Sequence, residues 1–143
     1  MRVQELARCE QVSADTIRHY VRIGLLRPVK KHNGYHEFTA SDQHRLRFIR
    51  QARDLGFTLD DIQTILHEAG RGSSPCPTVR HLIEPRLAEA RSRLQAMQAL
   101  VERMEKAVAS WQAMPDCHPS GDHICHLIEN CDAPVAAEEK CGE

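Results

Sequence analysis

The sequence predicts a mainly α-helical protein, and three observations support this expectation. Aromatic residues make up only 4% of the 143 residues, fewer than a compact enzyme core of this size usually contains. Apolar residues recur at alternating steps of four and three through the second half of the chain, which is coiled-coil spacing. Ser and Thr residues stand where further helices would need N-caps. We therefore expect short capped helices followed by one long helix.

Charge is unevenly distributed along the chain. Residues 1–56 contain 11 Lys and Arg against 6 Asp and Glu, whereas the remainder is acidic. A basic segment on an acidic chain is typical of a head that binds a polyanion, although a local imbalance also arises by chance. The sequence has no signal peptide and no apolar run long enough to span a membrane, so we expect a cytoplasmic protein without a membrane partner. Its six cysteines should then be reduced and available for metal or redox chemistry.

Residues 1–38 have the pattern of a winged helix–turn–helix. A helical pattern at about residues 2–9 is followed by a tight turn and a second helix capped by Ser13, which could lie in a major groove. Asn33-Gly34 predicts a β-hairpin, because both residues tolerate positive φ. Basic groups near the hairpin tip could bind backbone phosphates without reading bases. These groups are Lys30, Lys31 and His36.

Residues 39–75 are expected to form a connector of two helices and a hinge. Each helix begins with a Thr that precedes an Asp by three positions, the spacing of a capping box. Gly56 ends the first helix, and the Gly- and Ser-rich stretch 70–75 ends the second and forms the hinge. The two capping pairs are Thr39 with Asp42 and Thr58 with Asp61.

A single long helix is predicted for residues 76–114. Its apolar seam runs without interruption from Ile83 to Trp111, which spans four heptads. At about 1.5 Å per residue, so long a helix cannot bury its whole stripe against a small head. A homodimer is therefore expected, with packing of the helix onto its own head as the alternative. Antiparallel pairing about the midpoint, Met97, places position 76 opposite position 118 of the partner chain.

Cysteine and histidine concentrate in residues 115–131. In the antiparallel pairing, Cys76 of one chain comes beside Cys117 of the other. Cys117 and Cys125 flank a Pro- and Gly-containing loop that can present both sulfurs to one ion. Thiolate and imidazole are ligands of Zn²⁺ and of its heavier relatives. Further candidate ligands or supporting groups are His118, His123, His126 and Cys131.

The remaining cysteines suggest no specific chemistry. Cys9, in the first helix, is expected to be a small packed residue. Cys141 belongs to an Ala- and Glu-rich tail, residues 132–143, that we expect to be disordered.

Three stretches of the head and connector resemble the MerR family of transcription regulators. They are residues 13–20 (SADTIRHY), residues 24–28 (GLLRP) together with Gly34-Tyr35, and residues 45–62 (RLRFIRQARDLGFTLDDI). The order of head, helix pair, long helix and C-terminal loop also agrees, so the resemblance covers nearly the whole chain. The sequence departs from the family pattern at His19, Val21 and His36, where relatives commonly have Tyr, an acidic residue and Arg.

The resemblance implies a winged helix–turn–helix head, a helix pair, a long antiparallel coiled-coil dimerisation helix and a C-terminal metal-binding loop. It implies a homodimer, not an enzyme, that binds a palindromic promoter operator. Effector binding would make the dimer bend and untwist the DNA for RNA polymerase. Tyr20 and Tyr35 could instead pack within the head. The DNA contacts would be Thr16, Arg18, His19, Tyr20, Lys30, Lys31, Tyr35, His36 and Arg45.

The same comparison assigns a metal site. Cys117 and Cys125 match ligands of the family's metal-binding loop, and Cys76 matches the cysteine contributed across the dimer in regulators of divalent ions. The effector would be Zn²⁺, Cd²⁺, Pb²⁺ or Hg²⁺, acting on a metal efflux or resistance promoter. The copper(I)-sensing branch has a similar loop but no cysteine at the hinge. Alternatives are a copper(I) sensor, a thiol-redox or iron–sulfur sensor, and a metal-sequestering adaptor that does not bind DNA.

Overall fold

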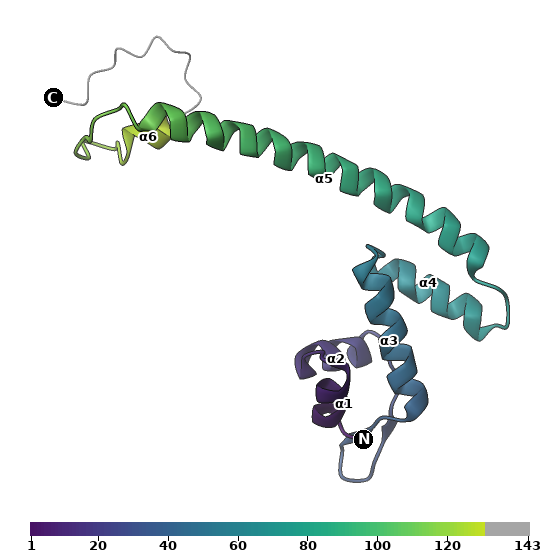
Figure 1. Cartoon of the computed structure of the whole chain (residues 1–143). Helices are drawn as coiled ribbons and strands as arrows, with labels where there is room; N and C mark the ends of the chain where they lie inside the picture. The colour runs from purple at the N-terminus through teal and green to yellow at the C-terminus, as the bar shows by residue number, and fades with distance from the viewer. Residues whose placement is uncertain (131–143) are drawn as a thin grey trace. The chain divides into compact units, whose positions relative to one another are not determined.

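The structure is a computed structural model that describes residues 1–130, and its fold is mostly helical (Figure 1). Cys131 and the predicted tail lie outside the described residues. The chain divides within its longest helix into two units, Met1–Glu89 and a second unit that begins at Ala90. In chain order the elements are α1 (Val3–Glu10), α2 (Ala14–Arg22), β1 (Val29–Lys30), β2 (His36–Glu37), α3 (Ala40–Asp54), α4 (Leu59–Gly70), α5 (Cys76–Trp111) and α6 (His126–Glu129).

The predicted helix starts are confirmed. The Ser13 hydroxyl accepts a hydrogen bond from the Thr16 amide at 3.1 Å and so caps α2. Helices α3 and α4 both begin with complete capping boxes, in which the Thr side chain and the Asp carboxylate each bind the other residue's amide. Gly56, with a φ of +106°, follows the end of α3. A left-handed residue of this kind suits glycine because it has no Cβ.

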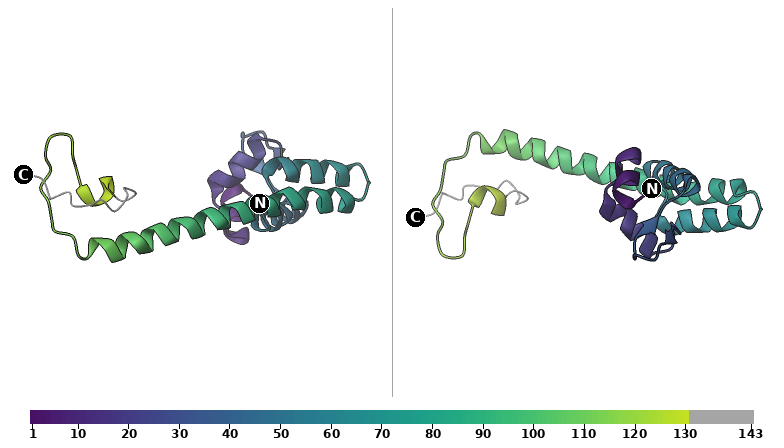
Figure 2. Two further views of the ribbon diagram at one scale, coloured as in Figure 1. Left: turned by 90° about the horizontal axis from the view of Figure 1, so that it is seen from above. Right: turned by 90° about the horizontal axis from the view of Figure 1, so that it is seen from below.

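The first unit contains the hydrophobic core. Seven Leu and Ile side chains are fully buried, and each contributes about 1.5–3 kcal/mol when it leaves water. The first turns of α5 belong to this unit, since Val79, Leu82 and Ile83 pack against the core. Both views in Figure 2 show α4 and the start of α5 side by side, joined by the predicted hinge. The seven buried side chains are Leu6, Ile17, Leu25, Leu26, Leu46, Ile49 and Ile62.

The β-hairpin differs in detail from the expected turn. Its antiparallel register pairs Lys30 with His36. Gly34 adopts a φ of +82°, but Asn33 does not take a positive φ. The Asn33 side-chain oxygen instead accepts the Tyr35 amide at 3.1 Å. One left-handed residue is therefore sufficient, because the Asn side chain stabilises the turn by a local hydrogen bond.

The N-terminal segment lies against the hairpin. The Phe38 amide donates to the Met1 carbonyl at 2.7 Å, and the Met1 amino group donates to the Glu37 carboxylate at 2.9 Å. The amino group also holds the pKa of Glu37 below its ordinary value, mainly through that hydrogen bond. This pairing fixes Arg2 and Val3 beside the hairpin.

From Ala90 onward, α5 exposes its apolar seam. Leu94, Met97 and Val108 retain 57–59% of their accessible surface. The helix ends at Trp111, three residues before the predicted end, where the Met114 amide turns back to the Trp111 carbonyl at 3.1 Å. No helix among the described residues is long and apolar enough to cross a membrane.

Candidate nucleic-acid interface and thiol ligands

Helix α2 presents two exposed arginines one turn apart. Arg18 Nη1 donates to the Asp15 carboxylate at 2.9 Å, which holds the Arg18 side chain along the helix. Arg22 Nη2 lies 3.5 Å from the His19 ring. Residues four apart share a helix face, so both guanidinium groups project from the same side of α2.

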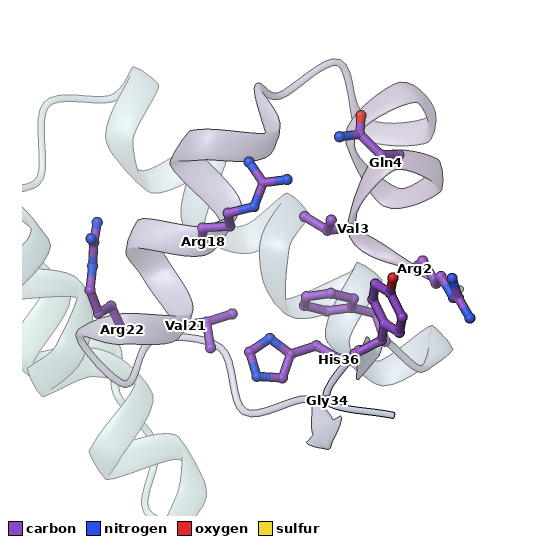
Figure 3. A pocket seen from close by; sticks show the side chains of 10 residues that line it. Arg2, Val3, Gln4, Arg18, Val21, Arg22, Gly34 and His36 are labelled. Atoms are coloured by element: carbon purple, nitrogen blue, oxygen red, sulfur yellow. The ribbon is translucent and has the colours of Figure 1, made fainter. Parts of the chain in front are cut away.

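This side of α2 forms one wall of a cleft of about 600 Å³, whose other walls are the N-terminal segment and the hairpin (Figure 3). Three arginines and one histidine line it, and none of the described residues that line it is acidic. A cleft with arginines from two separate segments, the N-terminal segment and α2, suits a phosphate of a nucleic-acid backbone. The lining residues are Arg2, Val3, Gln4, Arg18, Val21, Arg22, Gly34, Tyr35, His36 and Phe38.

Side-chain contacts orient the hairpin wall of the cleft. The Arg2 guanidinium lies over the Tyr35 ring, 4.2 Å from its centroid, in a cation–π contact. The half-buried His36 ring meets the Phe38 ring edge-on at a centroid distance of 6.4 Å. His36 therefore lies in the cleft, although the sequence suggested a place at or near the hairpin tip.

The other expected DNA contacts have varied surroundings. Lys30 and Lys31 are exposed on the hairpin outside the cleft. Tyr20 is half-buried and packs against the core. The Thr16 hydroxyl lies 2.7 Å from that of Ser13, within the α2 cap. Arg45 donates from Nε to the Leu25 carbonyl at 2.6 Å, a contact that supports the turn after α2.

Sequence reasoning did not assign Arg2, Gln4 and Arg22 to the interface. The sequence could have indicated Arg22, because it follows Arg18 by one helical turn and so shares its helix face. Arg2 and Gln4 had no such signal, since their place in the cleft depends on the long-range pairing of Met1 with Phe38.

Three cysteines within the described residues are free thiols: Cys9, Cys76 and Cys125. The expectation that Cys9 is packed is wrong, because its side chain is exposed. The buried face of α1 carries Leu6 and Glu10, so Cys9 points away from the core. Cys76 is exposed at the first residue of α5, and Cys125 is half-buried at the N-cap of α6. Cys117 is disulfide-bonded.

The loop between α5 and α6 is folded back on itself. The His126 Nε2 atom lies 2.9 Å from the Pro115 carbonyl, which brings the two ends of the loop together. Ser120 and His123 form a bridge through two backbone hydrogen bonds of 2.9 and 3.2 Å. The Glu129 carboxylate accepts the amides of Ile124 and Cys125. Cys125 is thus held at a defined position near the loop end.

The candidate histidines differ in their surroundings. His126 Nε2 is engaged with the Pro115 carbonyl, a contact that holds the loop closed. His118 and His123 are exposed. Across residues 1–130, no three His, Cys, Asp or Glu side chains gather as a metal site within one chain.

A winged helix–turn–helix with a basic cleft, joined to a long helix with an exposed seam, defines a DNA-binding transcription regulator. The profile "MerR HTH family regulatory protein" matches residues 1–69, and the profile "MerR, DNA binding" matches residues 43–107. The chain belongs to the MerR family.

Individual relatives agree with this assignment. ZntR from Escherichia coli strain K12 is 35% identical over 111 residues, which cover 74% of this chain and 79% of that protein. A "probable heavy metal-dependent transcriptional regulator" from Haemophilus influenzae is 30% identical, with 82% and 94% covered. The structure of PbrR691 from Ralstonia metallidurans CH34, in complex with lead(II), matches with a TM-score of 0.66 at 25% identity, covering 91% and 98%. These relatives are transcription regulators, so the chain is a regulator and not an enzyme.

Proposed function

We propose that this chain is a homodimeric regulator that senses a thiophilic divalent ion, Zn²⁺, Cd²⁺, Pb²⁺ or Hg²⁺, and activates a metal efflux or resistance promoter. One observation carries the proposal. The free, exposed thiol of Cys76 is at the first residue of α5, the helix whose apolar seam would pair two chains. An ion bound there would link the dimer contact to the DNA-binding head.

The dimer follows from the exposed seam. Leu, Met and Val side chains form a row along α5 from Leu87 to Val108. Each of these side chains retains at least 37% of its accessible surface. So large an apolar stripe marks a surface that binds another protein. A second copy is the simplest partner, because its heptad spacing is the same. In the antiparallel pairing, each Cys76 would face the partner's loop.

Cys76 of one chain would complete the ligand set with Cys117 and Cys125 of the partner. Further ligands would come from His118, His123 or His126 of the loop, and Cys131 lies outside the described residues. Thiolates favour soft divalent ions, which fits the lead(II) complex of PbrR691 and the heavy-metal name of the Haemophilus relative. Because Cys117 is disulfide-bonded, its use as a ligand requires the reduced protein.

The DNA side of the proposal rests on the cleft. The cleft would bind backbone phosphates of a palindromic operator through Arg2, Arg18 and Arg22, and α2 would enter the major groove. Deforming DNA costs a few kcal/mol, and an ion can favour the deformed state only by binding it more tightly. RNA polymerase would then use the realigned promoter.

An anaerobic titration of the reduced full-length protein tests the proposal. Zn²⁺, Cd²⁺, Pb²⁺, Hg²⁺ and Cu⁺ would each be added to the wild type, to Cys76→Ser and to Cys9→Ser, with thiolate-to-metal absorbance as the readout. We expect divalent ions to bind the wild type and Cys9→Ser equally, and Cys76→Ser much more weakly. Cys9 is a matched control because it too is a free, exposed thiol. Binding of Cu⁺ alone, unaffected by Cys76→Ser, would instead support a copper sensor.

The disulfide at Cys117 favours a second candidate, a thiol-redox switch. In that case a change in DNA binding caused by oxidation would be reversed by a reductant and not by a chelator. The divalent-metal proposal expects the opposite pattern in the reduced protein.

A further inference from the structure

An ion pair joins the long helix to the start of α4. Arg86 Nε donates to the Asp61 carboxylate at 2.7 Å, and Arg86 also binds Glu89 at 2.8 Å. Asp61 is only 5% exposed. Burial alone would raise the pKa of Asp61, but hydrogen bonds from Arg86 and Thr58 outweigh it and keep the pKa below its ordinary value. The pair is therefore charged and fixed at neutral pH.

Asp61 also decides where α4 begins. Its carboxylate accepts the Thr58 amide at 3.0 Å, and its own amide donates to the Thr58 hydroxyl at 3.1 Å. One carboxylate thus binds both the cap of α4 and a guanidinium of α5. A displacement of α5 at Arg86 would therefore also displace Asp61 and the first turn of α4.

The same turn of α4 reaches the end of α2. Gln63 Nε2 donates to the carbonyl of Ile23 at 3.0 Å, and Ile23 is the C-cap of α2. Between the two polar residues, Ile62 is fully buried in the core. Arg86, Asp61 and Gln63 therefore form a continuous chain of contacts from α5, through the first turn of α4, to the helix that faces DNA.

The other end of the α4–α5 hairpin is also fixed. The Thr78 hydroxyl, two residues after Cys76, donates to the Glu68 carboxylate at 2.7–2.8 Å. With Glu68–Thr78 at the hinge and Asp61–Arg86 further along, α4 and the first turns of α5 should move as one body. Apolar contacts permit sliding, whereas directional hydrogen bonds at two places do not.

We propose that Arg86, Asp61 and Gln63 are positioning residues that transmit a displacement of α5 to α2. The inference rests on the proposed function, because the displacement would come from an ion bound at Cys76. Gln63 is the most informative of the three residues. Its hydrogen bond to Ile23 is exposed, so water can replace it without a loss of folding.

The test measures DNA deformation, which a purely structural role would not alter selectively. The probe is a palindromic duplex that the wild-type protein selects from a random-sequence pool, labelled with a dye pair at its ends. Energy transfer would be recorded for the reduced full-length protein without metal and with each of Zn²⁺, Cd²⁺, Pb²⁺ and Hg²⁺. The variants are Gln63→Met, Arg86→Met and the double variant, with Gln95→Met and Arg93→Met as exposed matched controls on α5.

We expect Gln63→Met to bind the duplex without metal within about twofold of the wild type. Its metal affinity should also be unchanged, whereas the metal-induced change in energy transfer should fall by about fivefold or more. Arg86→Met should show the same selective loss, and the double variant should lose no more than the larger single effect, because both residues belong to one chain of contacts.

The outcomes separate the two proposals. If the wild type responds to metal and Gln63→Met responds equally, the transmission inference is wrong and the metal-sensor proposal stands. If Gln63→Met weakens DNA binding without metal as much as with it, Gln63 is only structural and the inference is also wrong. If the wild type responds to none of the four ions, the proposed function fails and the inference fails with it.

Discussion

The Glu10 carboxylate, at the last residue of α1, accepts a bifurcated hydrogen bond from Arg47 Nε, at 3.0 Å to each oxygen. Gln43 donates to the same carboxylate at 2.6 Å, and Arg50 donates to the Glu10 backbone carbonyl. Glu10 is only 2% exposed. The hydrogen bond from Arg47 lowers the pKa of Glu10 despite the opposing effect of burial. This cluster attaches α1 to α3.

Glu10→Gln should lower the free energy of unfolding by about 1–3 kcal/mol, because it removes charge-assisted hydrogen bonds at a buried position. Urea unfolding followed by circular dichroism would measure the change. Glu5→Gln, an exposed carboxylate of the same helix, is the control and should alter stability by less than about 0.5 kcal/mol. Equal effects from both variants would contradict a structural role of the Glu10 cluster.

The Glu10 contribution should depend on pH in one direction. Its folded pKa lies below the ordinary value of 4.5, so the stabilisation is present above that value. It is lost as the pH falls through the folded pKa, since both states then bind the proton. The stability difference between wild type and Glu10→Gln should therefore shrink in acid. A difference that stays constant from neutral pH into acid would count against this account.

Arg22→Gln should weaken DNA binding and its dependence on salt. If the Arg22 guanidinium in the cleft binds one phosphate per chain, the slope of log Kd against log salt should fall by about two per dimer. Binding titrations at several salt concentrations would show this. Arg80→Gln, an exposed arginine outside the cleft, should leave the slope unchanged. An unchanged slope for Arg22→Gln would remove Arg22 from the interface.

Mixed dimers should reveal a metal site shared between chains. Neither Cys76→Ser nor Cys117→Ser/Cys125→Ser should bind Pb²⁺ tightly as a homodimer. Refolding the two variants together should restore binding in the heterodimer, because the intact hinge thiol then faces the intact loop of the partner. Lead-to-thiolate absorbance of the mixture is the measurement. A site built within one chain predicts no recovery on mixing.

Pro85→Ala should stabilise the protein. Pro85 lies inside α5, where it lacks the amide that would donate to the preceding turn. An interior proline costs about 3 kcal/mol relative to alanine in an isolated helix, so an increase of up to that size is expected in urea unfolding. Pro77→Ala is the matched control, since Pro77 is in the first turn, where the missing amide has no helical partner. A loss of stability in Pro85→Ala would show that the folded state requires the proline at this position.

Features that depend on near neighbours were predicted from the sequence. The capping boxes Thr39–Asp42 and Thr58–Asp61 need only two side chains three residues apart, so their spacing is sufficient. The seam of α5 is a periodic property of one helix and is equally visible in the sequence. The helix–turn–helix and hairpin followed from the same kind of local signal.

Only the tertiary structure decided which distant groups meet. Arg2 enters the cleft because Met1 pairs with Phe38, and Arg86 reaches Asp61 across 25 residues of chain. Cys9 is exposed because the charged Glu10 takes the buried place on α1, where Arg47 neutralises it. Such contacts depend on how whole helices pack, and no periodicity or spacing encodes a partner tens of residues away. The sequence by itself therefore determined the helices and the chemistry that they carry, and the packing of the core decided which of those groups work together.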